Sequence, residues 1–204
     1  MNLNKEDVLK IFKSTEALLE GHFLLTSGRH SNQYFQCAKV LQYPDYTSQI
    51  CSLIANNFKN HEIDTVIAPA MGGMIVGYEV ARQLNKRSIF TERENKEMTL
   101  RRGFSLSKGE KVLVCEDVVT TGGSVFEVIE IVKKFDAEVV GVGSIVDRSN
   151  GTVDFGYEFF PSLRLNAVSY PPEDCTICKE GKLELVKPGS RKVLNSRPLG
   201  TGFR

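Results

Sequence analysis

The feature that most constrains the fold is an alternation of short apolar runs with helical stretches, which begins near residue 64. Apolar runs of this length are typical of buried strands, and apolar residues at helical spacing separate them. Strands joined through helices run parallel in one sheet, and helices cover both faces of such a sheet. We therefore expect an α/β fold. The expected strands are 65–69, 88–92, 111–115, 139–146 and 163–168, and the expected helices between them are 74–84 and 125–135.

The residues on either side of this alternation are expected to be appendages of one domain. The spacing in residues 5–19 predicts an amphipathic helix, and residues 22–42 have the alternation of a strand pair around a Ser-Gly turn, with a further helix after it. Residues 1–60 are too few for a strong core of their own, so we interpret them as a hood. Residues 61–170 would form the ligand-binding core, and residues 171–204 a tail rich in Pro, Gly and Lys.

Charge and hydrophobicity argue against several classes of function. The 26 basic and 25 acidic residues leave a formal charge of +1, whereas binding to nucleic acid or to an anionic membrane needs an excess of cations. The longest uncharged run, Thr65–Tyr78, is shorter than the ~20 residues that span a bilayer. The first ten residues lack the apolar stretch of a signal peptide. With five cysteines, an odd number, we expect reduced thiols and a cytoplasmic protein.

Residues Lys111–Val125 carry the clearest chemical pattern. An apolar strand ends in Glu116 and Asp117, and the sequence Thr-Thr-Gly-Gly-Ser at 120–124 then opens a helix. Glycines let a backbone approach a ligand closely, and hydroxyls and the free N–H groups of a helix start bind phosphate. Carboxylates repel phosphate and suit ribose hydroxyls or the waters of a magnesium ion. The pattern indicates a sugar-phosphate site, and the alternative is an ordinary turn with a Ser N-cap.

The stretch Val112–Ser124 resembles the phosphoribosyl pyrophosphate (PRPP) binding motif of type I phosphoribosyltransferases. His22–Gln36 resembles the N-terminal segment of orotate phosphoribosyltransferases, Ile67–Gly73 their pyrophosphate loop, and Val146–Arg148 their strand-end arginine. The resemblance implies a parallel sheet flanked by helices with an N-terminal hood, the PRPP site lying in the core of 61–170. It also implies transfer of the ribose 5-phosphate of PRPP to orotate in pyrimidine (UMP) biosynthesis, which gives orotidine 5′-monophosphate and pyrophosphate, with Mg²⁺ as cofactor.

The same resemblance implies a role for each matching residue. Asp117 and Lys96 would act in catalysis, and both acids of the motif would face the ribose hydroxyls. Thr120 and Arg148 would contact orotate, whose carboxylate suits a guanidinium fork. The 5′-phosphate would lie on residues 120–124. The residues implied to bind PRPP are Arg93, Lys96, Glu116, Asp117, Val118, Val119, Thr120, Thr121, Gly122, Gly123 and Ser124.

The charged segment 94–110 is long for a connection between strands. Long segments without secondary structure are usually functional lids or disordered, so we expect residues 94–104 to be ordered only when ligand binds. The resemblance implies a homodimer in which Lys96 reaches the partner's site, and the alternative is a solvated charged loop. Basic or histidine residues common in the family are replaced here by Thr26, Glu92, Met98 and the lysine-free stretch 70–73. Our candidates to compensate are Arg29, Arg101 and Arg102.

Cys175 and Cys178 have the spacing of a metal-binding or redox pair. A structural zinc ion needs four ligands, and the three histidines, His22, His30 and His61, lie far away in sequence without paired spacing. The two cysteines could share zinc across a dimer or form a redox switch. We interpret them instead as an ordinary terminal pair, treat the histidines as structural or surface residues, and expect no metal ligands among the protein side chains.

Two other functions are compatible with the PRPP motif. One is a purine phosphoribosyltransferase on the same fold, against which the segment 22–36 and Arg148 argue. The other is a regulator that binds PRPP without transferring it, which would keep residues 116–124 and could dispense with Lys96. A basic DNA-binding face would support a regulator, but the net charge of +1 gives no sign of one.

Overall fold

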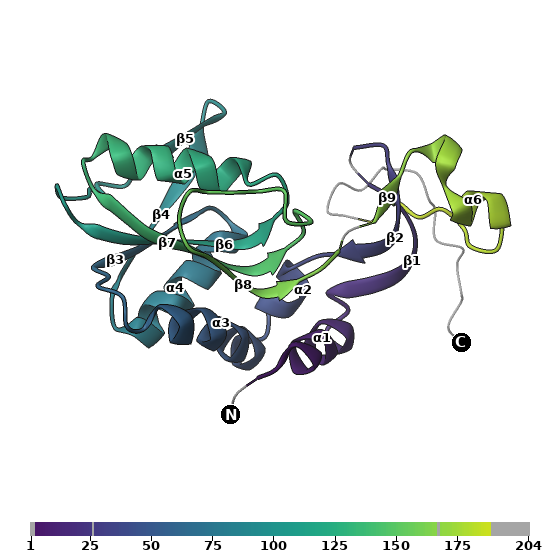
Figure 1. The fold of residues 1–204 in the computed structure, drawn as a ribbon, viewed down its shortest axis with the longest axis horizontal. Coiled ribbons are helices and arrows are strands. Elements are labelled where there is room, and N and C mark those ends of the chain that lie inside the picture. The colour runs from purple at the N-terminus through teal and green to yellow at the C-terminus, as the bar shows by residue number, and fades with distance from the viewer. Residues whose placement is uncertain (1–2, 26, 167, 189–204) are drawn as a thin grey trace, which may run out of the picture.

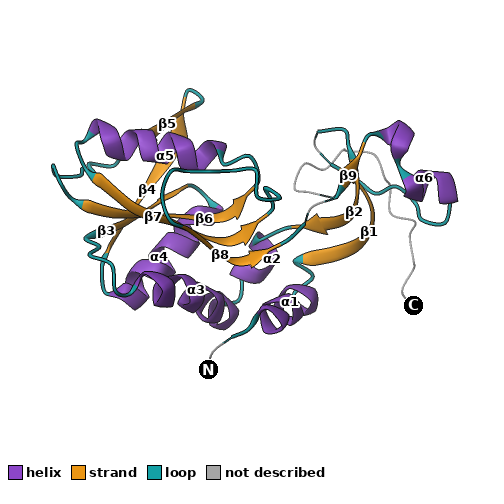
Figure 2. Ribbon diagram, in the orientation of Figure 1, coloured by secondary structure: helices purple, strands orange, loops and turns teal. Residues whose placement is uncertain are grey.

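The computed structural model of the protein describes residues 3–25, 27–166 and 168–188. Within these residues the chain forms a six-stranded sheet, in the order β5-β4-β3-β6-β7-β8, and a three-stranded sheet, in the order β1-β2-β9 (Figures 1 and 2). The strands of the larger sheet are β3 (Thr65–Pro69), β4 (Arg87–Glu94), β5 (Glu97–Leu100), β6 (Lys111–Val119), β7 (Glu138–Asp147) and β8 (Phe159–Arg164).

The larger sheet confirms the expected α/β fold. Its strands run parallel except β5, which pairs antiparallel with β4 at one edge. Helix α5 (Gly123–Lys134) covers one face, while α3 (Pro44–Phe58) and α4 (Gly72–Leu84) cover the other (Figure 1). Because both faces are covered, the centre of β6 is apolar throughout, and its residues 112–115 are fully buried.

The smaller sheet and its neighbours form the hood. Strand β2 pairs antiparallel with β1 on one side and with β9 on the other. After β9 the chain turns through α6 and returns beside β1, where the Val186 N–H donates to the His22 carbonyl at 2.9 Å. Part of the expected tail therefore belongs to the hood. The elements on this side are α1 (Lys5–Ser14), β1 (Leu18–Leu24), β2 (His30–Phe35), β9 (Ser169–Tyr170), a 3₁₀ turn (Pro172–Asp174) and α6 (Thr176–Glu180). Helix α2 (Ala38–Leu41) follows β2 and contacts α3 and α4.

Several boundaries differ from the sequence predictions. The helix predicted over 5–19 ends at Ser14, because Glu16 has a positive φ of 55° that an α-helix cannot contain. The strand predicted over 163–168 lies earlier, as β8. Helix α3 falls within residues 1–60, which were expected to form the hood, but its apolar face packs in the same core cluster as α4 and the sheet. No helix of the described residues is long and apolar enough to cross a membrane.

The segment 94–110 contains regular structure that the sequence analysis did not predict. Residues Asn95 and Lys96 both have positive φ, at 50° and 74°, and form a tight turn between β4 and β5. Met98 and Leu100 on β5 pack against the apolar cluster under α5. The prediction of a connection without secondary structure was therefore wrong, because a two-residue turn and two modest apolar anchors are enough to extend the sheet.

Candidate active site

The candidate site lies at the carboxyl ends of the parallel strands, where open α/β sheets bind their ligands. Strand β6 ends at Val119, and β7 ends next to it at Asp147, with which Val119 is in register. The Arg148 N–H donates to the Val119 carbonyl at 2.8 Å. This bond holds the start of the 120–124 turn beside the end of β7.

A hollow of about 280 Å³ lies over this turn. Gly122 is the N-cap of α5 and has a φ of 76°, a left-handed conformation that favours glycine. Since Gly122 has no side chain to cap the helix, the first N–H groups of α5 face the hollow without an internal acceptor. The alternative of a turn capped by a serine is therefore wrong. The hollow is lined by Arg93, Glu116, Val118, Val119, Thr120, Thr121, Gly122, Gly123, Ser124, Val125 and Glu127.

The acidic pair at the end of β6 lies against the start of α4. A Cβ atom at Gly72 would overlap the carboxylate of Asp117, and one at Gly73 would come within 2.9 Å of Glu116 Oε1. The two glycines thus let the helix start approach the acids closely, and the positive end of the helix dipole favours the charge of Asp117. Glu116 is only 8% exposed, whereas Asp117 is half-buried.

The burial of Glu116 changes its protonation. Burial, and then the charge of Asp117, raise the pKa of Glu116 from an ordinary value near 4.5 to about 9. Glu116 therefore carries its proton at neutral pH. The motif implies the same role for both acids, because adjacent residues of one motif differ in burial only once the chain is folded.

The raised pKa of Glu116 predicts how the stability of the fold depends on pH. Its raised pKa means that the folded state keeps a proton that the unfolded chain releases above about pH 4.5. The resulting stabilisation is complete below that pH and is lost as the pH rises toward about 9. The Tm of Glu116→Gln minus the Tm of wild type, both measured without ligands, should therefore be larger at about pH 8.5 than at about pH 5. Equal Tm differences at both pH values would contradict this, and the exposed Glu138→Gln serves as the control.

Arg148 lies half-buried at the end of β7. Desolvation lowers the pKa of its guanidinium, while the nearby Tyr34 of β2 acts in the opposite direction. Among the described residues no carboxylate forms an ion pair with Arg148, whereas its neighbour Asp147 pairs with Arg164 at 3.4 Å. A partly desolvated cation without an acidic partner is a suitable site for the carboxylate of a ligand.

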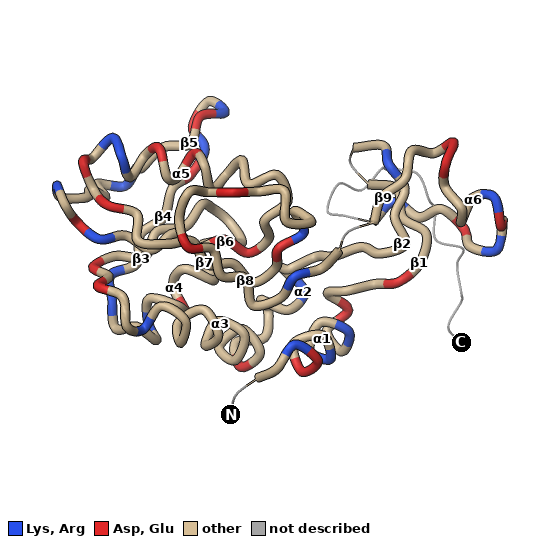
Figure 3. The backbone as a smooth tube through the Cα atoms, viewed as in Figure 1, with Lys and Arg blue, Asp and Glu red and all other residues tan. Residues whose placement is uncertain are grey.

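The two basic residues of the β4–β5 hairpin have different positions. Arg93 lines the hollow, and its guanidinium bridges the Glu127 carboxylate at 2.5 Å and the Lys96 carbonyl at 2.8 Å. Lys96 is exposed at the tip of the hairpin and does not line the hollow. Figure 3 shows this tip projecting from the edge of the larger sheet, with basic and acidic positions close together.

The comparisons with known proteins agree with this geometry. A family model described as the phosphoribosyl transferase domain matches residues 39–159. A protein of Desulforamulus reducens named orotate phosphoribosyltransferase is 58% identical over 191 residues, which cover 94% of this chain and 100% of the relative. A relative of the same name from Caldicellulosiruptor bescii is 58% identical over 190 residues, 93% of this chain and 100% of its own. The chain belongs to the orotate phosphoribosyltransferase family.

A solved structure supports the same family. The crystal structure of orotate phosphoribosyltransferase from Aeropyrum pernix matches with a TM-score of 0.68 at 26% identity, covering 78% of this chain and 93% of that one. The resemblance drawn from the sequence motifs is thereby confirmed, together with the type I phosphoribosyltransferase fold.

The candidate site contains two residues that were not singled out from the sequence. Glu127 lies one turn into α5 and pairs with Arg93, and Tyr34 lies near Arg148. The spacing of Glu127 from Gly123 on an expected helix could have indicated it, since residues four apart share a helix face. The position of Tyr34 near Arg148 depends on where the hood lies relative to the larger sheet, and no local sequence pattern contains that information.

The proposed substitutes for the missing basic residues are already engaged within the protein. Arg101 and Arg102 pair with Glu92 at 3.7 and 2.9 Å. Arg29 donates to the Ser169 hydroxyl at 2.9 Å and to its carbonyl at 2.6 Å. These cations are therefore partly satisfied without ligand. Thr26, the other departure in the hood, lies outside the described residues.

Proposed function

We propose that this protein transfers the ribose 5-phosphate of PRPP to orotate and releases orotidine 5′-monophosphate and pyrophosphate. The observation that carries the proposal is the backbone hydrogen bond between Arg148 and Val119. This bond holds a phosphate-binding turn next to a cation that suits a carboxylate. The phosphate-binding turn begins at the next residue, Thr120, and Arg148 supplies a half-buried cation. PRPP offers the phosphate, and orotate differs from uracil in having a carboxylate.

Each part of PRPP has a proposed position. The 5′-phosphate lies on residues 120–124, where hydroxyls and the N–H groups at the start of α5 supply donors. The ribose hydroxyls face Asp117. The pyrophosphate lies toward the start of α4, whose positive dipole end favours an anion, and Arg93 is the cation of the hollow on the other side.

Magnesium is the proposed cofactor. Carboxylate oxygens are the ligands that Mg²⁺ prefers. Asp117 presents one beside Gly72 at the start of α4, and Glu116, which lines the hollow, would supply a second on releasing its proton as the ion binds. These residues fit the ion, and they would hold it together with the oxygens of PRPP. When bound, Mg²⁺ supplies positive charge that stabilises the leaving pyrophosphate.

The protein's contribution to the reaction is positioning and charge stabilisation. The bond between C1′ and the pyrophosphate oxygen breaks with its electron pair on that oxygen, and positive charge develops on the ribose. The N1 atom of orotate then bonds to C1′ and loses its proton to the medium. Asp117 lies where its negative charge stabilises the ribose cation, and Arg148 holds the orotate carboxylate so that N1 faces C1′.

Arg148→Ala is expected to raise KM for orotate by about 10- to 150-fold and to leave KM for PRPP nearly unchanged. The estimate corresponds to the ~1.5–3 kcal/mol of a hydrogen bond to a charged group. Arg148→Lys keeps the charge but loses the fork, so its KM should lie between those of wild type and Arg148→Ala. Steady-state kinetics with each substrate varied in turn will measure both constants. A rise in KM for PRPP alone would place the base elsewhere.

We propose that the protein acts as a homodimer in which Lys96 serves the partner's site. Lys96 lies at an exposed hairpin tip away from the hollow of its own chain, which supports a role outside that chain. Large apolar side chains are also exposed along one side of α4: Met71 is 82%, Ile75 47% and Tyr78 66% exposed. Contiguous apolar surface of this kind is typical of an interface, and it lies beside the acidic pair.

A cytoplasmic location is also proposed. All five cysteines are free, and three of them, Cys37, Cys51 and Cys115, are buried in the apolar core. Free thiols are typical of proteins from a reducing compartment. Burial in this core raises the pKa of the Cys51 and Cys115 thiols well above the usual range, so these thiols are unreactive.

The experiment that tests the function is a substrate screen with purified protein, PRPP and Mg²⁺. We expect loss of orotate absorbance and release of pyrophosphate with orotate, and no transfer to adenine, guanine or hypoxanthine. Transfer to a purine would favour the purine enzyme instead. PRPP binding by calorimetry without transfer to any base would favour the regulator.

A further inference from the structure

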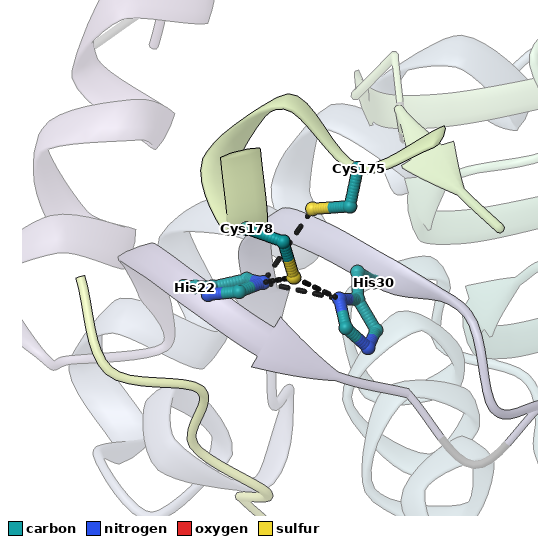
Figure 4. Close-up of side chains that lie close together, drawn as sticks. All are labelled: His22, His30, Cys175 and Cys178. Atoms are coloured by element: carbon teal, nitrogen blue, oxygen red, sulfur yellow. Dashed lines mark hydrogen bonds between the residues drawn. The ribbon is translucent and has the colours of Figure 1, made fainter. Parts of the chain in front are cut away.

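A cluster of four potential metal ligands lies in the hood, and none of them lines the hollow of the active site. His22 comes from β1, His30 from β2, and Cys175 and Cys178 from the segment around α6. Their nearest N and S atoms all lie within 4.8 Å of one another (Figure 4). The interpretation of the cysteines as an ordinary pair far from any histidine does not fit this arrangement, since the hairpin and the returning C-terminal segment bring all four together.

Hydrogen bonds alone do not explain the contacts of His22 Nε2. That single atom lies 3.1 Å from His30 Nδ1 and 3.5 Å from the sulfur of each cysteine. A ring nitrogen has either one proton or one lone pair, so it can make one good hydrogen bond of this kind and not three. The other ring nitrogen, Nδ1, lies 3.2 Å from the Leu183 carbonyl, an acceptor. This contact places the proton on Nδ1 and turns the lone pair of Nε2 toward the cluster.

The distances match those between the ligands of one tetrahedral ion. With Zn–N of about 2.0 Å and Zn–S of about 2.3 Å, the ligand atoms of a tetrahedral zinc ion lie about 3.3 to 3.8 Å apart. The N···N separation is 3.1 Å, and three N···S separations are 3.3 to 3.5 Å. Atoms this close leave room for a single ion at their centre.

We propose that His22, His30, Cys175 and Cys178 form a structural zinc site. Two thiolates and two imidazoles in a tetrahedron are a donor set that selects zinc, and four protein ligands leave no open position for a substrate. A carbonyl bonded to the second nitrogen of a histidine is the outer-shell partner usual at such sites, and Leu183 provides it for His22.

A metal site would stabilise the hood, whose interior has few apolar side chains around these four residues. Three of its ligands are among the most buried polar or sulfur-containing residues there, with His22 4%, His30 5% and Cys175 0% exposed. The interior of this small sheet therefore contains ligand atoms where a larger domain would have apolar side chains. Segments that cannot build a sufficient core are commonly held by a metal. The ion would fasten the segment 171–188 to the β1–β2 hairpin, which contains Tyr34, a neighbour of Arg148.

Metal analysis of the full chain tests the proposal. The protein is produced with an affinity tag that contains no histidine, and its metals are measured by mass spectrometry after dialysis. We expect about one zinc per chain, falling at least about tenfold in Cys178→Ser and in His30→Asn. Cys178 is the exposed ligand, so its substitution is the one least able to disturb the packing. The matched controls are Cys51→Ala and His61→Asn, which lie outside the cluster and should keep the full zinc content.

Two further measurements keep the proposal falsifiable if a variant fails to fold. Wild-type protein reloaded with Co²⁺ should show the intense visible absorption of tetrahedral cobalt and a charge-transfer band from thiolate. Thiol titration of the unfolded, unreduced chain should find all five cysteines free. Wild-type protein that neither contains nor takes up zinc, that contains stoichiometric iron instead, or that has a Cys175–Cys178 disulfide would overturn the assignment. Full zinc retention in folded Cys178→Ser would do the same.

Discussion

Asp117→Asn is expected to lower kcat/KM by on the order of 10²–10³-fold and to leave the Tm close to that of wild type. The substitution is nearly isosteric, so the side chain keeps its close packing against Gly72 and the bond in which Asp117 Oδ1 accepts from the Val118 N–H at 2.9 Å. It removes the negative charge that we place beside the ribose. The effect should therefore fall on transition-state stabilisation and not on folding.

The control for this prediction is Asp136→Asn. Asp136 is exposed at the end of α5 with a φ of 55°, a conformation that asparagine also tolerates. Its kinetics should match wild type. Because the charge of Asp117 is one cause of the raised pKa of Glu116, its loss lets Glu116 ionise more readily. The double variant Glu116→Gln/Asp117→Asn should therefore be less active than Asp117→Asn alone. A folded Asp117→Asn with normal kcat/KM would refute the assigned PRPP site.

The central part of this fold and its PRPP motif could be predicted because they depend on residues close together in the sequence. The strand at 65–69 has the predicted bounds, and the phosphate-binding turn at 120–124 follows β6 directly and leads into α5. In such segments the apolar period, the glycines and the helix start all indicate the same structure. Their interpretation needed no knowledge of which segments lie side by side.

The features that could not be predicted depend on contacts between distant segments. The four residues of the zinc cluster come from two parts of the chain more than 140 residues apart, and His22 and His30 become neighbours only when β1 pairs with β2. The raised pKa of Glu116 depends on its burial by segments distant in sequence, such as the start of α4, where Gly73 lies against it. Strand β5 was missed for another reason, since its four residues alternate too weakly to be distinguished from a charged loop.

The second large effect concerns the proposed sharing of sites between subunits. Lys96→Gln removes the charge at the hairpin tip and leaves a side chain of similar length at the same positive φ. If Lys96 stabilises the departing pyrophosphate, its loss should lower kcat by on the order of 10²–10³-fold, as does the loss of one preorganised donor. A homodimer of Lys96→Gln and a homodimer of Asp117→Asn should therefore both be nearly inactive.

Mixing these two variants distinguishes a shared site from a site within one chain. After random exchange between equal amounts, half of the dimers are hybrids with C₂-related sites. In a shared arrangement each hybrid has one site with both defects and one site with neither, so the mixture should recover about a quarter of wild-type activity. If Lys96 acts within its own chain, every site keeps one defect and no activity returns.

The matched control is a mixture of Asp117→Asn with Arg148→Ala, assayed at low orotate. Asp117 and Arg148 lie at the ends of adjacent strands of one chain, so each site of that hybrid keeps one defect. This mixture should recover nothing beyond the sum of its parts. Exchange itself is checked by two different affinity tags, which must co-purify from the mixture. If the tags co-purify and the mixture of Lys96→Gln with Asp117→Asn stays inactive, Lys96 does not serve the partner's site. The chemistry proposed for residues 116–124 would still hold, because it depends on the geometry of β6 and α5 within one chain.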